Sequence, residues 1–170
     1  MKYILMFIVF TASALFLNAF GTEKNNKSDF DSRSETQQLQ DFAAITESKN
    51  FIFYARVATP MNARNINLTS EYNVRVSNDS VFSYLIYQGM SHSAVFGGTE
   101  NPMIFNLPFS NYKTKKTKNG YLVKLSVKNG TDHLNFSFHI SESGSTNLNV
   151  SSINRQPMSY SGEISGLEMN

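Results

Sequence analysis

The stretch GYLVKLSVKNGTDHLNFSFHIS, Gly120–Ser141, decides the fold of this chain. Apolar and polar residues alternate on both sides of Asn129-Gly130, which is the pattern of two half-buried strands. Asn-Gly between two such runs is the strongest short-range signal for a tight β-hairpin. The hairpin should place these side chains on one buried face: Tyr121, Val123, Leu125, Val127, Leu134, Phe136, Phe138 and Ile140.

Further alternating runs lie on both sides of this hairpin. They are FIFYARV (51–57), INLTSEYNVRVS (66–77), VFSYLIYQG (81–89), PMIFNLPF (102–109), TNLNVSSI (146–153) and MSYSGEI (158–164). About eight strands joined mostly by short turns are typical of an antiparallel up-and-down β-barrel. Closure would bring residues 158–164 beside residues 51–57 and remove both open sheet edges. The predicted fold class is therefore mainly β.

The N-terminus has the pattern of an export signal. Lys2 precedes a continuous apolar run, and the small residues Ala19 and Gly21 follow it. The run is shorter than the roughly 20 apolar residues that a membrane-spanning helix needs. We therefore expect a cleaved signal peptide at 1–21, a polar linker at 22–33, and no stable membrane insertion of the mature protein.

The remaining residues, 34–170, are predicted to form a single domain that begins with one short amphipathic helix. Ser34 with Gln37 resembles a capping box. The positions that follow have the spacing of one helix face: Leu39, Phe42, Ala43 and Thr46. Such a helix would cover an open edge or end of the barrel.

Composition excludes several kinds of chemistry. The chain has no cysteine, so the lipobox cysteine of bacterial lipoproteins, disulfides and thiolate metal sites are all missing. Together with an export signal, this favours a bacterial periplasmic or secreted protein. A net charge of +2 gives no general attraction to nucleic acid. The G-x-S-x-G and H-E-x-x-H signatures are absent, so we expect no enzymatic activity and no cofactor.

Two groups of polar residues are candidate binding sites. His133 and His139 fall on the outward face of one predicted strand, too far apart to chelate one ion, so no metal site is expected. The hairpin around Asn119-Gly120 carries six lysines and no acid: Lys113, Lys115, Lys116, Lys118, Lys124 and Lys128. These lysines could contact an anionic glycan, lipid headgroup or nucleic acid, or could simply keep a solvent-exposed sheet from associating edge to edge.

Segments in both halves of the chain carry a family resemblance. INLTSEYNVRVSNDSVFSYLIYQG (66–89) and the stretch from Phe109 to Ile164 resemble the domain-of-unknown-function family DUF4251, exported proteins of Bacteroidota, and the likeness runs from about Phe51 to Ile164. The matching positions are Ile66–Leu68, Asp79, Tyr84, Leu85, Tyr87, Gly89, Asn154, Arg155 and Ser159–Gly162. This sequence departs from the family at residues 85–90, where LIYQGM replaces the frequent LPYFGR. The resemblance implies a lipocalin-like β-barrel and no assigned activity.

Arginines and tyrosines are the candidate ligand-binding residues. Arginine can hold a carboxylate through two parallel hydrogen bonds, and tyrosine supplies apolar area with one polar group. We therefore predict ligand-binding roles at the barrel mouth for Arg56, Arg64, Tyr84, Tyr87, Arg155 and Tyr160. Alternatively, Arg155 pairs with Glu163 or Asp79, or binds loop carbonyls, and only closes the fold.

Two functions remain open at this point. The first is a non-enzymatic periplasmic binding module that holds a small apolar or amphiphilic ligand near the barrel mouth, under a lid formed by residues 89–102. The second is a structural or protein-interaction module of the cell envelope, with a packed barrel and no ligand. The bulky apolar residues at the inward positions predict a packed core.

Overall fold

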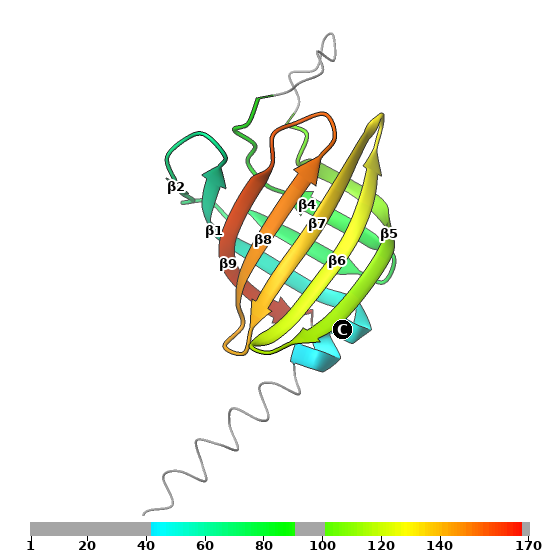
Figure 1. The fold of residues 1–170 in the computed structure, drawn as a ribbon. Helices are drawn as coiled ribbons and strands as arrows, with labels where there is room; N and C mark the ends of the chain where they lie inside the picture. The colour runs from blue at the N-terminus through cyan, green and yellow to red at the C-terminus, as the bar shows by residue number, and fades with distance from the viewer. Residues whose placement is uncertain (1–41, 91–100, 168–170) are drawn as a thin grey trace, which may run out of the picture. The chain divides into compact units, whose positions relative to one another are not determined.

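The computed structural model of this chain describes residues 42–90 and 101–167. A helix over residues 42–48 precedes nine antiparallel strands (Figure 1). The strands are β1 Asn50–Pro60, β2 Ile66–Asn67, β3 Asn73–Ser77, β4 Ser80–Tyr84, β5 Ile104–Thr117, β6 Gly120–Asn129, β7 Asp132–Ser141, β8 Ser145–Ser152 and β9 Met158–Gly166. The predicted signal peptide, linker and helix start lie outside the described residues.

The sheet closes on itself. β3 to β9 pair in sequence order, and β1 lies between β3 and β9. The seam between β1 and β9 runs from Phe51 opposite Gly166 to Pro60 opposite Met158. Because both edges of the sheet are paired, the predicted up-and-down barrel is confirmed as a closed antiparallel barrel of eight strands with one short extra strand, β2.

The run predicted as one strand over residues 66–77 is divided into β2 and β3, so this part of the prediction is wrong. Both strands pair with β1 on the side opposite β9. Near the break, the N–H of Ala55 donates to the carbonyl of Tyr72, and the N–H of Leu68 donates to the carbonyl of Arg56 (both 2.8 Å). β1 has a bulge at Arg56, and this irregularity breaks the ladder even though the apolar alternation continues.

The hairpin that decides the fold has the predicted register. Tyr121 lies opposite Ile140, Val123 opposite Phe138, and Val127 opposite Leu134. Asn129 and Asp132 flank the turn, where Gly130 has a φ of 61°. The left-handed conformation is the reason that a two-residue turn needs glycine or asparagine here. The alternation therefore places the eight predicted apolar side chains of this hairpin on the inner face, whereas Leu122, opposite His139, lies on the outer face.

Large side chains fill the inside of the barrel. Phe51, Phe53, Phe136, Phe138 and Tyr160 are each at most 1% exposed. Phe51 and Phe138 contact edge to face, with ring centroids 5.4 Å apart, a favoured aromatic geometry. The prediction of a packed core at these positions is confirmed.

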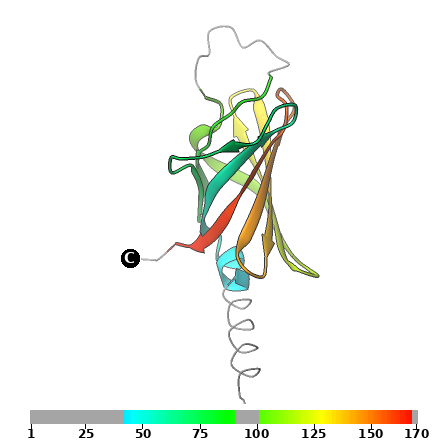
Figure 2. The same cartoon turned by 90° about the vertical axis from the view of Figure 1, so that its left-hand side faces the viewer.

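The helix lies against one end of the barrel (Figures 1 and 2). Thr46 is fully buried, and its carbonyl accepts a hydrogen bond from the hydroxyl of Tyr112 on β5. The ring of Phe42 lies over Gly144, where an added Cβ would approach it to 2.7 Å. The predicted amphipathic helix thus covers an end of the barrel, as its apolar face requires. No helix within residues 42–90 and 101–167 is long and apolar enough to cross a membrane.

The chain around residues 85–90 and 101–103 packs at the opposite end. Leu85 and Met103 are buried. The side chain of Asn101 donates to the carbonyl of Leu85 (2.8 Å), and the hydroxyl of Ser83 donates to the carbonyl of Met103 (2.7 Å). The strand predicted over residues 81–89 therefore ends at Tyr84, because the chain turns inward over the core. Most of the predicted lid, 91–100, lies outside the described residues.

Candidate functional site

Arg155 takes part in an ion pair at the end of the barrel opposite the helix. Its Nε donates to Asp132 Oδ2 at 3.2 Å. The same carboxylate accepts two contacts from the hydroxyl of Ser152 (2.7 and 2.9 Å) and one hydrogen bond from the backbone N–H of His133 (2.8 Å). Asp132 begins β7 and Ser152 ends β8, so this cluster connects two neighbouring strands to the segment that leads into β9. The acidic partner of Arg155 is therefore Asp132, and not Glu163 or Asp79.

Two of the predicted tyrosines lie beside this cluster. The hydroxyl of Tyr87 donates to the carbonyls of Met90 and Gln156 (3.1 and 3.2 Å), and the guanidinium of Arg155 lies 6.0 Å from the Tyr87 ring centroid. The hydroxyl of Tyr160 donates to the carbonyl of Ile86 (2.7 Å). Burial raises the pKa of Tyr87 and, further, that of Tyr160 above the ordinary tyrosine value.

These hydrogen bonds join the residue 85–90 segment to the chain before β9. Two further bonds complete the contact: Gln156 N–H donates to the Met90 carbonyl (3.0 Å), and Met90 N–H donates to the Gln156 side chain (3.2 Å). Tyr87, Arg155 and Tyr160 are thus brought together, and their polar groups bind the protein's own chain. Their predicted ligand-binding role stays a prediction.

The other three predicted ligand residues do not join this cluster. Arg56 occupies the bulge of β1 and Arg64 the loop after it, and both are exposed. Tyr84 is 39% exposed on the outer face of β4, where its ring stacks on that of Tyr72 at 5.4 Å. Because alternation places Tyr84 on the outside of the sheet, the six predicted residues do not form one cluster, and their ligand-binding role stays a prediction.

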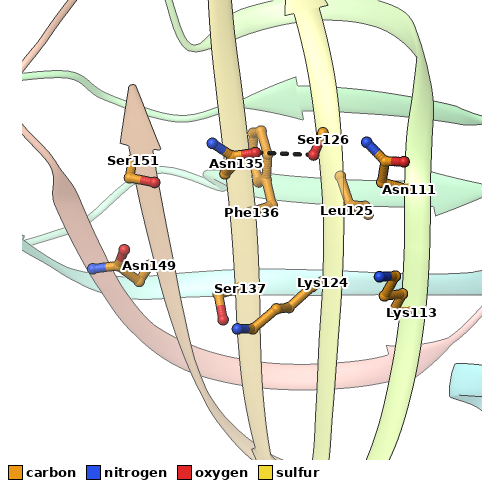
Figure 3. Close-up of a pocket in the computed structure, with 10 residues that line it drawn as sticks. All are labelled: Asn111, Lys113, Lys124, Leu125, Ser126, Asn135, Phe136, Ser137, Asn149 and Ser151. Atoms are coloured by element: carbon orange, nitrogen blue, oxygen red, sulfur yellow. Dashed lines mark hydrogen bonds between the residues drawn. The ribbon is translucent and has the colours of Figure 1, made fainter. Parts of the chain in front are cut away.

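A different site lies on the outer face of β5 to β8. It is a hollow of about 720 Å³, and we call it the outer groove. The residues that line it are Asn111, Lys113, Lys124, Leu125, Ser126, Asn135, Phe136, Ser137, Asn149 and Ser151 (Figure 3). Amide, hydroxyl and ammonium groups make up its polar lining, and none of these ten residues is acidic.

The polar lining forms two rows across the strands. In one row Ser126 lies opposite Asn135, and Asn135 lies opposite Ser151. In the other row the order is Lys113, Lys124, Ser137 and Asn149. Strand spacing of about 4.8 Å gives the longer row a length of about 14 Å, and two residues along a strand separate the rows by about 7 Å. The groove therefore has room for an extended ligand of a few rings.

A β-bulge in β5 shapes one wall of the outer groove. Ser110 lies opposite Ser126, but Lys113 lies opposite Lys124, so β5 has one extra residue between these pairs. Asn111 sits at the bulge with a φ of 55°, a left-handed conformation that asparagine tolerates better than most residues. The extra residue lets Asn111 and Lys113 both line the groove while Tyr112 between them reaches the helix.

Hydrogen bonds hold several groove side chains in place. The hydroxyl of Ser126 donates to the side-chain oxygen of Asn135 at 2.9 Å (Figure 3). The side-chain nitrogen of Asn149 donates to the hydroxyl of Ser159 at 3.1 Å. Asn135 thus keeps its NH₂ as a donor and Asn149 keeps its oxygen as an acceptor. A ligand with hydroxyl groups, which both donate and accept, matches this arrangement.

Sequence reasoning missed the outer groove. Its residues are the outward halves of alternating strands and look like an ordinary solvated face. One signal was present in the sequence: the apolar positions Phe105, Leu107 and Phe109 recur every two residues, and the next is Tyr112, three residues on. This change of phase marks the bulge. Among the histidines, acids and cysteines of the described residues, no group of three or more is placed to hold a metal ion.

Comparisons with known proteins agree with the barrel. A family model described as Domain of unknown function (DUF4251) matches residues 33–164. A solved crystal structure of a DUF4251 family protein from Bacteroides eggerthii DSM 20697 is similar in fold, with a TM-score of 0.56 and 15% sequence identity, over 79% of this chain and 91% of that chain. No curated protein sequence matches this chain. Because the family model covers more than half of the sequence, the chain belongs to the DUF4251 family, whose function is unknown.

Proposed function

We propose that this protein is an exported, non-enzymatic binding module that recognises a saccharide in the outer groove. The observation that carries the proposal is the groove itself, a hollow of about 720 Å³ lined by amides, hydroxyls and lysines on the outer face of β5 to β8. Export rests on the N-terminal sequence pattern, and the absence of catalysis rests on the missing signatures.

The packing of the barrel favours an external site over an internal one. Bulky side chains such as Phe53, Phe138 and Tyr160 occupy the interior and are almost fully buried. Tyr87 and Arg155, predicted to hold an amphiphilic ligand at the mouth, bind Gln156 and Asp132. A small apolar ligand inside the barrel would have to displace these contacts. We therefore place the binding function on the outer face.

The polarity of the outer groove favours a saccharide over an apolar ligand. Its outward side chains are polar, and the lining residues Leu125 and Phe136 themselves point into the core. The cross-strand bonds at Asn135 and Asn149 restrict the rotation of these side chains before a ligand arrives. Groups that are already ordered lose less conformational entropy on binding. The site is therefore prepared for hydrogen bonding to ligand hydroxyls.

The experiment is a titration of the mature protein with a panel of neutral and acidic oligosaccharides, followed by calorimetry or by NMR shifts. We expect binding to weaken about tenfold in the double variant Asn135→Ala/Asn149→Ala, because two hydrogen bonds of about 0.7 kcal/mol each are lost. Asn106→Ala is the matched control, since Asn106 is an exposed amide on β5 that lines a different hollow. Equal losses in both variants, or no binding by any member of the panel, would contradict the proposal.

Native mass spectrometry separates the external site from an internal one. Protein purified gently from its own periplasm should have the mass of the chain without residues 1–21 and should carry no tightly held apolar molecule. An apolar adduct that disappears on organic extraction would favour a ligand inside the barrel. An unprocessed N-terminus would contradict export.

A further inference from the structure

We infer that the saccharide bound in the outer groove is acidic, and that Lys113 and Lys124 hold its anionic group. This inference rests on the proposed function and adds the chemical class of the ligand. It starts from the register of β5 and β6, in which Lys113 lies directly opposite Lys124 and both line the groove.

Two like charges directly opposite each other on antiparallel strands destabilise the sheet. No acidic side chain lines the groove to offset this repulsion, because its other lining residues are neutral. Within residues 42–90 and 101–167, the one ion pair joins Arg155 to Asp132 at the barrel end and involves neither lysine. In the sequence no acid occurs from Asn101 to Thr131, so the whole β5–β6 hairpin lacks a local counterion.

The bulge in β5 creates this pairing of lysines. With the extra residue, Lys113 returns to the outer face opposite Lys124. Figure 3 shows the Lys124 side chain extended across β7 toward Ser137, so that its ammonium group points away from Lys113. A ligand anion in the groove would supply the missing counter-charge to both ammonium groups. Such charge-assisted hydrogen bonds are stronger than neutral ones.

The remaining groove residues favour an acidic saccharide over nucleic acid. Recognition of single-stranded nucleic acid relies on aromatic side chains on which bases stack. The ring of Phe136, the one aromatic residue among those lining the groove, is buried in the core. Asn111 and Asn135 provide neutral amides, and Ser137 and Ser151 provide hydroxyls, beside the two lysines. A carboxylate or sulfate surrounded by ring hydroxyls matches both the charge and the polar rows.

The test compares trigalacturonic acid with a neutral galactotriose, and a sulfated galactotriose with the same neutral galactotriose, at low salt. The wild-type protein should prefer the acidic member of at least one pair by about tenfold, and salt should reduce that preference. The pair that shows the preference identifies the anion as carboxylate or sulfate. Lys113→Gln/Lys124→Gln should abolish the preference and leave neutral binding in place.

Lys116→Gln/Lys118→Gln is the matched control. It removes two exposed lysines from the same hairpin and changes the net charge equally, but neither residue lines the groove. This control should keep the preference. The groove double variant should also melt at a higher temperature than wild type, because it relieves the repulsion between Lys113 and Lys124. If the two lysines only stabilised the fold, their replacement would not raise the melting temperature while weakening binding.

The outcomes separate the two proposals. Equal binding of acidic and neutral probes, weakened by the Asn135/Asn149 variant, overturns the acidic inference and leaves the saccharide site intact. An acidic preference that both lysine double variants lose equally also overturns the inference, because general charge then explains it. No binding of any probe overturns the proposed function and the inference together.

Discussion

Replacement of Asp132 should test whether the ion pair at the barrel end stabilises the fold. The side chains of Arg155 and Asp132 are 21% and 9% exposed, so the pair is largely shielded from water. Asp132→Ala removes the acceptor of Arg155, of the Ser152 hydroxyl and of the His133 N–H. It also leaves the guanidinium without its counter-charge.

The size of the effect follows from this geometry. Removal of one partner from a fully buried pair costs about 3–5 kcal/mol, and partial exposure of Arg155 places this case at the low end, about 3 kcal/mol of unfolding free energy. Asp132→Asn keeps an oxygen for the Ser152 hydroxyl or the His133 N–H and should cost only about 1–2 kcal/mol. The ranking of the two variants is therefore part of the prediction.

Urea unfolding of the mature protein measures both values, provided that the slope with denaturant is unchanged. Glu163→Ala is the control, because Glu163 is an exposed acid on β9 and was one of two other acids predicted as a partner of Arg155. An exposed side chain of this kind should change stability by no more than about 0.5 kcal/mol. A loss below about 1 kcal/mol in Asp132→Ala, or a loss as large in Glu163→Ala, would refute the reasoning.

Two further predictions concern the strands. Gly120 and Gly130 both have positive φ (137° and 61°), but an added Cβ would overlap the carbonyl oxygen of Ile140 at Gly120 and would meet nothing within 4 Å at Gly130. Gly130→Ala should cost about 1 kcal/mol and Gly120→Ala about 3 kcal/mol or more in urea unfolding, and equal costs would be inconsistent with this packing. Burial raises the pKa of Tyr112 to about 12. The unfolded tyrosine ionises near pH 10, so the unfolded state loses its proton first and stability should fall between pH 10 and about 12. Tyr112→Phe should reduce this loss of stability at high pH and should cost about 1 kcal/mol of unfolding free energy at neutral pH, because the hydrogen bond to Thr46 is lost. If the variant lost stability above pH 10 as steeply as wild type, the ionisation of Tyr112 would not be the reason.

The barrel was predictable because its information is local. Alternation identifies the inward side chains, and Asn129-Gly130 fixes the register of β6 and β7. Closure of β9 on β1 follows from the cost of leaving two open edges. The breaks were not predictable from alternation. Residues 66–77 keep one phase throughout, yet the ladder is interrupted opposite the bulge at Arg56.

The ligand residues were harder to predict because they depend on contacts between distant segments. Arg155 meets Asp132 only after the chain has formed two further strands, and no spacing in the sequence connects them. The outer groove depends in the same way on which outward residues become neighbours across strands. Asn135, Ser126 and Ser151 come from three strands and share one row only when the register is known.

The bulge at Asn111 links the closure of the barrel to the formation of the groove. In a regular strand, Tyr112 would share the phase of Ser110 and point to solvent, and Lys113 would point to the core. The extra residue reverses both directions: Tyr112 turns inward and binds the carbonyl of Thr46, while Lys113 lies opposite Lys124 on the outer face. Docking of the helix therefore favours the same backbone conformation that places Lys113 opposite Lys124. The hydrogen bond from Tyr112 to Thr46 favours this conformation of β5 without any contribution from a ligand.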